Sequence, residues 1–123
     1  MKKILIADDE PNILMSLEYS FKKNDFQVFI ARDGQEAIDI LANEIPDVII
    51  LDIMMPKVDG YATIEFIKSE PKLADCKIIF LSAKNKESDV EKGIRLGADA
   101  YVTKPFSVKK LLEQVNSLVP EKN

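Results

Sequence analysis

Three aspartates stand at the ends of short apolar runs, where they could share a metal ion. Asp8 and Asp9 directly follow the run Ile4–Ala7. Asp52 directly follows the run Val48–Leu51. If these runs are neighbouring parallel strands, the three carboxylates meet at one edge of a sheet, where ligands of such sheets bind. Clustered carboxylates repel one another, and Mg²⁺, which prefers oxygen ligands, relieves that repulsion. The spacing therefore predicts a magnesium site.

A simpler role is open for each of these aspartates. Asp9 with Glu10 and Pro11 could start a helix, and Asp52 could cap a turn before Pro56. Capping explains either site alone as well as metal binding does. It does not explain why two acidic sites lie at equivalent strand ends, or why two further strand ends carry polar residues.

Those two further strand ends carry a lysine and a serine. Lys104 follows the apolar run Ala100–Val102, and its ammonium could pair with a phosphoryl oxygen. A cis bond to the next residue, Pro105, would fix the direction of this lysine. Ser82 follows the run Ile78–Leu81, and its hydroxyl could donate to an anion or cap the next helix. Each signal is weak alone and gains weight from the shared sheet edge.

Alternating strands and helices are predicted to position these residues. The expected strands are Ile4–Ala7, Val28–Ile30, Val48–Leu51, Ile78–Leu81 and Ala100–Val102. Several are continuously apolar, which is typical of strands covered on both faces. Helical periodicity is found from Pro11 to about Phe21, from Asp33 to about Leu41, over Gly60–Lys68, over Glu87–Leu96 and from Ser107 to about Val119. This alternation predicts one α/β domain with a parallel sheet, filling residues 1–123.

Helix-end signals support these boundaries. Pro11 suits a first helical turn, and Asp33 with Glu36 matches a D-x-x-E capping box. Gly97 is placed to end the fourth helix, and Ser107 to cap the last one.

The composition limits the function classes. The net charge is −4, which argues against direct binding of nucleic acid, and no run reaches the roughly 20 apolar residues of a membrane span. The single Cys76 cannot form an intramolecular disulfide, which favours a reducing, cytoplasmic setting. Its simplest role is that of a small core residue. The chain has no histidine, so it cannot itself supply a phosphohistidine.

The ordered motifs resemble the receiver domain of two-component response regulators. The matching residues are Asp8-Asp9, Val48–Pro56, Asp59-Gly60, Leu81-Ser82-Ala83, Gly97–Tyr101 and Thr103-Lys104-Pro105-Phe106. The likeness runs from about Lys2 to Val119. It implies a flavodoxin-like, doubly wound fold with five strands in the order 2-1-3-4-5, as in chemotaxis regulators.

The resemblance also implies a role for each matched residue. Asp52 would be the phosphoacceptor and a ligand of Mg²⁺, with Mn²⁺ as a substitute. Asp9 would be a direct ligand, Asp8 would act through water, and Met54 would contribute only its backbone carbonyl. Lys104 and Ser82 would contact the phosphoryl oxygens. Tyr101 would be a switch residue, whose rotamer follows the state of Ser82.

The implied partner is a sensor histidine kinase or a phosphotransfer protein that donates a phosphoryl group. The chain would be a switch that catalyses its own phosphorylation and dephosphorylation, and not an enzyme with a separate substrate. The output face would comprise residues 87–96, 100–102 and 108–119, whose mixed charge could support a homodimer. Ala100 departs from the second acidic residue found in a subfamily joined to DNA-binding domains. A stand-alone regulator and the receiver of a longer, transcription-controlling protein both remain open.

Three rival functions are less consistent with the sequence. A haloacid dehalogenase-type phosphatase needs a second aspartate where this chain has Met54. A flavodoxin-like nucleotide or flavin module needs a phosphate-binding loop after the first strand, where Asp8 and Asp9 would repel phosphate. A pseudo-receiver that only binds partners would not need the complete set of aspartates, serine and lysine.

Overall fold

The computed structural model describes residues 1–120, and its strands form one parallel sheet in the order β2-β1-β3-β4-β5. The strands are β1 (Lys2–Ala7), β2 (Phe26–Ala31), β3 (Val48–Leu51), β4 (Lys77–Ser82) and β5 (Ala100–Thr103). Every neighbouring pair is parallel. The predicted fold class and strand order are confirmed.

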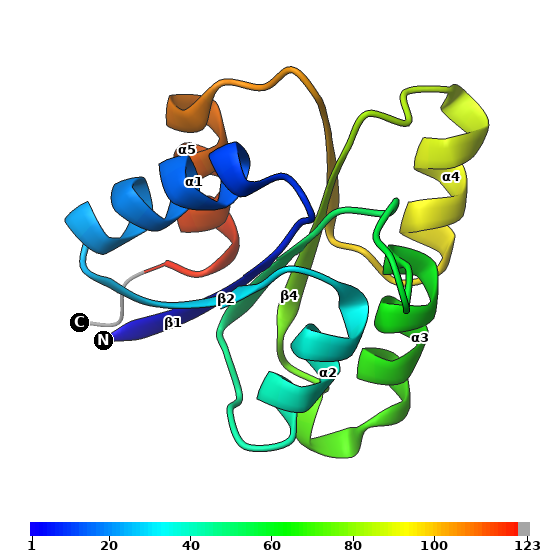
Figure 1. The fold of residues 1–123 in the computed structure, drawn as a ribbon, viewed down its shortest axis with the longest axis horizontal. Coiled ribbons are helices and arrows are strands. Elements are labelled where there is room, and N and C mark those ends of the chain that lie inside the picture. The colour runs from blue at the N-terminus through cyan, green and yellow to red at the C-terminus, as the bar shows by residue number, and fades with distance from the viewer. Residues whose placement is uncertain (121–123) are drawn as a thin grey trace.

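Helices cover both faces of this sheet (Figure 1). They are α1 (Pro11–Lys23), α2 (Gly34–Leu41), α3 (Gly60–Ser69), α4 (Glu87–Arg95) and α5 (Val108–Leu118), with a 3₁₀ turn at Pro71–Leu73. Figure 1 shows α1 and α5 together on one face, and α2, α3 and α4 on the other. Within the described residues, no helix is both long and apolar enough to cross a membrane.

Most element boundaries lie within two residues of the predicted ones. Strand β2 begins at Phe26, two residues earlier than expected, because the buried Phe26 ring packs edge-on against Phe21 at 5.2 Å between centroids. Ser107 caps α5 as predicted, accepting the Lys110 N–H at 3.2 Å. Gly97 lies just beyond α4 with φ of +115°, a conformation that favours glycine.

The predicted capping box at α2 is only half formed. Asp33 accepts the Glu36 N–H at 2.8 Å, as expected. The Glu36 carboxylate does not return to the Asp33 N–H; it accepts the N–H of Arg32 at 2.9 Å and pairs with the Arg32 guanidinium. The guanidinium of Arg32 therefore draws the carboxylate one residue further back, toward the N-terminus.

The sheet separates two apolar clusters. One lies beneath α2 and α3 and includes Leu5, Ile49 and Phe80, and the other lies beneath α1 and α5 and includes Ile6, Leu17 and Ile50. Successive residues of β3 alternate between the two, which explains why this strand is wholly apolar. Cys76 is buried beside β4, its thiol donates to the Pro46 carbonyl, and burial raises its pKa to about 11. This environment agrees with a core role for Cys76.

Candidate functional site

The main chain of the sheet fixes the positions of three predicted site residues. The ladder of hydrogen bonds continues one residue past the strands: Asp8 N–H donates to Ala31 O at 3.1 Å, and Asp52 N–H donates to Ala7 O at 2.9 Å. Lys104 N–H donates in the same way to a backbone carbonyl of β4 at 2.9 Å. Asp8, Asp52 and Lys104 are therefore held as firmly as strand residues at the carboxyl edge of the sheet, with Asp8 and Asp52 at the point where the strand order reverses.

The three predicted aspartates come together at that edge. Asp8, Asp9 and Asp52 each offer a carboxylate oxygen, and these oxygens lie within 4.8 Å of one another. Asp8 and Asp52 are buried, with 1% and 5% of their surface exposed, whereas Asp9 is exposed. Two buried carboxylates beside an accessible one form a pocket that could bind a metal.

Lys104 lies among these carboxylates. Its Nζ is 2.9 Å from Asp8 Oδ2, 3.2 Å from Asp52 Oδ2 and 3.4 Å from a carboxylate oxygen of Glu10. Burial by itself would lower the pKa of Lys104, but its contacts with Asp8 and Asp52 outweigh burial and raise that pKa. The ammonium is therefore charged at neutral pH and partly neutralises the acidic cluster.

One of the two carboxylate oxygens of Asp8 lacks a well-placed hydrogen-bond donor within the described structure. Its Oδ1 accepts the Glu10 N–H at 2.9 Å. Its Oδ2 is buried and, among the described residues, receives no hydrogen bond of good geometry, although the Lys104 ammonium is close. Burial raises the pKa of Asp8, and the nearby charge of Asp52 adds to the rise, against the opposing effects of the Glu10 N–H and Lys104. An oxygen-rich site with a buried, under-coordinated carboxylate oxygen fits a hard divalent cation.

The capping roles considered for the acidic residues receive little support. Glu10 is the N-cap residue of α1 but makes no side-chain capping bond. Asp52 Oδ1 accepts the adjacent Ile53 N–H at 2.7 Å, which orients the carboxylate, while Oδ2 faces Lys104. Asp8 and Asp52 thus point toward Lys104, and all three aspartates lie close to one another.

Ser82 and Tyr101 are joined through the main chain of Lys84. Ser82 is fully buried at the end of β4, and its Oγ accepts the Lys84 N–H at 3.2 Å, so it does not cap α4. The half-buried Tyr101 donates its hydroxyl to the Lys84 carbonyl at 2.7 Å, and burial raises its pKa to about 12. In the described structure Ser82 makes no hydrogen bond to Asp52.

Met54 lies on the rim of the site, with 61% of its surface exposed. The Lys104–Pro105 peptide bond is cis. A hollow of about 890 Å³ lies elsewhere, against Lys2 and Lys23, and has none of the predicted site residues in its lining. The exposed Asp9 and Met54 leave the carboxylate site accessible from solvent.

Sequence reasoning missed the parts played by Glu10 and Lys84, and it matched Gly60 as a motif residue without foreseeing its contact with Asp52. Glu10 reaches Lys104 across 94 positions, Lys84 links two side chains through its backbone, and Gly60 packs against the backbone of Asp52. Glu10 could have been suspected, because it continues the acidic run Asp8-Asp9. The role of the Lys84 backbone leaves no mark in a sequence, because any residue has the same peptide groups.

Comparisons with known proteins agree with this fold and site. The model of the response regulator receiver domain matches residues 4–116. The chain therefore belongs to the response regulator receiver domain family.

Solved structures of receiver domains are similar over nearly the whole chain. The receiver domain of Francisella response regulator 1452 is 33% identical, with 96% of each chain covered and a TM-score of 0.89. The receiver domain of a signal transduction histidine kinase from Syntrophus aciditrophicus is 32% identical, with 100% of this chain and 96% of that chain covered and a TM-score of 0.89. The chemotaxis response regulator CheY4 of Vibrio cholerae is 25% identical, with 97% and 99% covered and a TM-score of 0.91. These relatives have different contexts, so the likeness defines the domain and not its output.

Proposed function

We propose that this domain is a Mg²⁺-dependent switch in which Asp52 accepts a phosphoryl group from a phosphohistidine. The donor is a sensor histidine kinase or a phosphotransfer protein. One observation carries the proposal: Lys104 Nζ lies 3.2 Å from the Asp52 carboxylate and 2.9 Å from Asp8, in a cluster of three aspartates. The buried Asp52 carboxylate at the end of β3 supplies the nucleophile. The Lys104 ammonium beside it supplies positive charge for the phosphoryl group that Asp52 accepts.

The cation is assigned to the oxygens of the acidic cluster. Asp9, Asp52 and the Met54 backbone carbonyl would hold Mg²⁺ directly, and Asp8 would hold it through water. When bound, the ion supplies positive charge to phosphoryl oxygens. The under-coordinated Oδ2 of Asp8 supports this assignment. Mn²⁺ takes similar oxygen ligands and is expected to substitute.

Transfer to Asp52 needs positioning more than covalent assistance. An oxygen of the Asp52 carboxylate forms a bond to phosphorus as the P–N bond of the donor breaks, and the electron pair returns to the imidazole nitrogen. Lys104 balances the charge on the transferred group, and the Ile53 N–H keeps the carboxylate oriented. Ser82, at the end of the adjacent strand β4, would donate its hydroxyl to a phosphoryl oxygen.

Phosphorylation would act on the face formed by α4, β5 and α5. A phosphoryl group that attracts the Ser82 hydroxyl would disturb its bond with the Lys84 N–H, and Lys84 O is the acceptor for Tyr101. The two charge states of Asp52 would thereby favour different placements of the loop before α4. This face would bind an output domain, a partner protein or a second copy of the chain.

Part of the charge on this face is used within the chain. The Asp99 carboxylate accepts the Ile78 N–H at 2.8 Å, which secures the start of β4. Asp99 is therefore less available for an ion pair with a second copy. A homodimer through this face would depend more on the lysines and glutamates of α4 and α5.

The test uses acetyl phosphate as a small phosphodonor. With Mg²⁺, we expect intact-mass measurements to show one added phosphoryl group, and no addition when EDTA removes the metal. Asp52→Ala should take up no label, whereas Asp39→Ala, on the exposed side of α2, should be labelled like the parent chain. Label that persists in Asp52→Ala would disprove the assignment. Steady turnover of an unrelated phosphate ester would instead indicate a phosphatase.

A further inference from the structure

The first residue of α3, Gly60, packs directly against the backbone of Asp52. A Cβ atom at this position would lie 2.7 Å from Ile53 Cα, 3.0 Å from the Asp52 carbonyl carbon, and closer still to the Asp52 carbonyl oxygen. Such separations are well inside van der Waals contact. The obstructing atoms belong to the main chain, so they cannot rotate away as a flexible side chain could.

Space, and not backbone conformation, requires glycine at this position. Gly60 has a φ outside the left-handed region, unlike Gly97 with its φ of +115°. Alanine also has a higher helix propensity than glycine. The local conformation would therefore favour alanine at the start of α3, and the contacts with the main chain of Asp52 and Ile53 oppose it.

The peptide that Gly60 touches also orients the Asp52 carboxylate. The Ile53 N–H of this peptide donates to Asp52 Oδ1 at 2.7 Å. The Ile53 carbonyl accepts the Gly60 N–H at 2.8 Å. The Asp52–Ile53 peptide is thus held between the side chain of Asp52 and the first turn of α3. A shift of that peptide would move the donor that directs the carboxylate.

We infer that Gly60 is a positioning residue for the phosphoacceptor, because its missing side chain sets the Asp52–Ile53 peptide and, through the Ile53 N–H, the direction of the Asp52 carboxylate. The inference rests on the proposed function of Asp52. Gly60 touches no reacting atom. It acts through the peptide that it supports.

The consequence for phosphoryl transfer follows from in-line geometry. With acetyl phosphate, an Asp52 oxygen forms a bond to phosphorus while the bridging P–O bond breaks, and acetate leaves with the electron pair. Misplacing a reacting group by about 1 Å can cost on the order of 10²-fold in rate. A methyl group at position 60 should displace the peptide by less than that, so we expect Gly60→Ala to label at least about tenfold more slowly.

Gly93→Ala provides a matched control. Gly93 is a second buried helical glycine, where a Cβ would lie 2.9 Å from a ring atom of Phe80 and 3.0 Å from one of Tyr101. This substitution adds the same methyl group at a similarly tight place, away from Asp52. With acetyl phosphate and Mg²⁺, followed by intact mass over time, Gly93→Ala should label within about twofold of the parent rate.

The second measurement is the amide proton shift of Ile53 in the folded protein without donor. A proton donated to a carboxylate at 2.7 Å resonates far downfield, and the signal should move upfield when the peptide is displaced. We expect this movement in Gly60→Ala and not in Gly93→Ala. General destabilisation does not selectively shift one amide in the folded species.

Either readout at its parent value in Gly60→Ala would overturn the inference. If the variant folds poorly, both measurements are made with trimethylamine N-oxide, which favours the folded state. A variant that stays unfolded under those conditions would also overturn it, because Gly60 would then be needed for folding and not for positioning. Absence of label in the parent chain, or label in Asp52→Ala, would instead disprove the function proposed for Asp52.

Discussion

The start of α3 and the middle of α4 each pack against the rest of the protein through a glycine, but the two glycines meet different kinds of atom. Gly60 on α3 meets main-chain atoms of Asp52 and Ile53, whereas Gly93 on α4 meets the rings of Phe80 and Tyr101. Main-chain atoms directly after a strand, held by the Asp52 N–H bond to Ala7 O, have few alternative positions, whereas rings can turn. We infer from this difference that the main chain at Asp52, the proposed phosphoacceptor, is fixed in place, whereas α4, part of the proposed output face, is movable.

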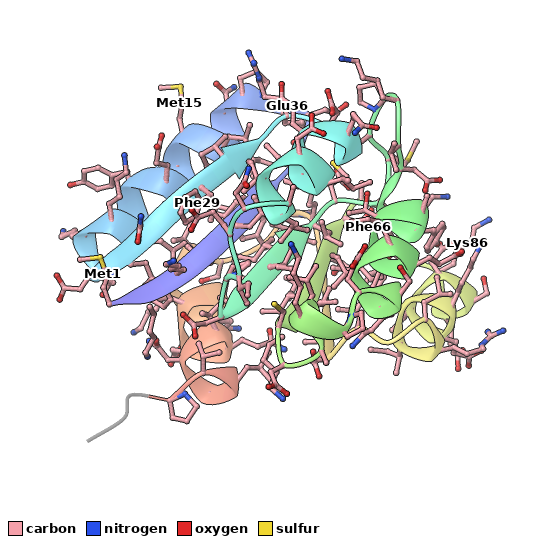
Figure 2. All side chains as sticks on the ribbon, turned by 90° about the horizontal axis from the view of Figure 1, so that it is seen from below. Met1, Met15, Phe29, Glu36, Phe66 and Lys86 are labelled. Carbon is pink, nitrogen blue, oxygen red and sulfur yellow. The ribbon has the colours of Figure 1, made fainter. Side chains whose placement is uncertain are left out.

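The rest of α4 supports this contrast. Gly93 is its one buried residue within the described structure, and Ile94 is 46% exposed. Its lateral contact is the Lys92 ammonium over the Tyr61 ring of α3, at 4.0 Å from the centroid. Elements with little buried apolar surface tend to open at low free-energy cost. In Figure 2, Lys86, the residue before α4, points away from the body of the molecule.

The largest predicted effect is at the fixed site around Asp52. Lys104→Met removes the ammonium that lies 3.2 Å from Asp52 and should slow labelling by acetyl phosphate by about 10²-fold, the usual cost of losing one preorganised donor. Intact mass over time measures the rate. Lys109→Met on α5 is the control and should label at the parent rate. Equal rates for the two variants would mean that the site does not depend on its fixed lysine.

Gly93→Ala should affect the movable region without affecting the site. Overpacking costs about 1–3 kcal/mol, and the better helix propensity of alanine returns up to about 1 kcal/mol. We therefore expect a loss of about 1–2 kcal/mol in urea unfolding, with faster hydrogen exchange in α4. A loss of labelling as large as that of Gly60→Ala would remove the distinction between the two glycines.

The substitution Asp8→Asn tests how much the ionisation of a buried carboxyl at the site lowers the free energy of unfolding. Burial raises the pKa of Asp8 in the folded chain. At a pH below the ordinary pKa of aspartate, the carboxyl is protonated in the folded and unfolded chain alike, so its burial costs no ionisation free energy. As pH rises through the raised folded pKa, the folded state must ionise a buried group, and stability is lost.

In the absence of divalent cations, Asp8→Asn should therefore be more stable than the parent chain at pH 7. We expect a gain, because the asparagine amide is neutral at both pH values and does not require a buried group to ionise. Urea unfolding near pH 3 and at pH 7 measures it, and the gain should vanish at the lower pH. A gain of the same size at both values would show that ionisation is not its cause.

The contrast between main-chain placement and side-chain packing also explains which features of the site were predictable from the sequence. The strand runs and their terminal residues Asp8, Asp52 and Lys104 were predictable, because the apolar pattern of each strand fixes where it ends. The space needed at Gly60 was not, because a glycine at a helix start is equally consistent with a turn. The contact of Glu10 with Lys104 depends on side chains 94 positions apart, whose distance only the packed sheet determines.

The smallest predicted effect concerns the lateral contact of α4. Lys92→Gln removes the cation over the Tyr61 ring but keeps most of the side-chain length. A cation–π contact at an exposed site is worth about 0.5–1 kcal/mol, so urea unfolding should show a loss of about that size. Lys109→Gln, on α5, should show a smaller change. If the Tyr61 contact holds α4 to α3, Lys92→Gln should also speed hydrogen exchange in α4 and leave the Ile53 amide shift unchanged. A change at Ile53 would mean that the movable helix and the fixed site are coupled through α3, and the separation between them would not hold.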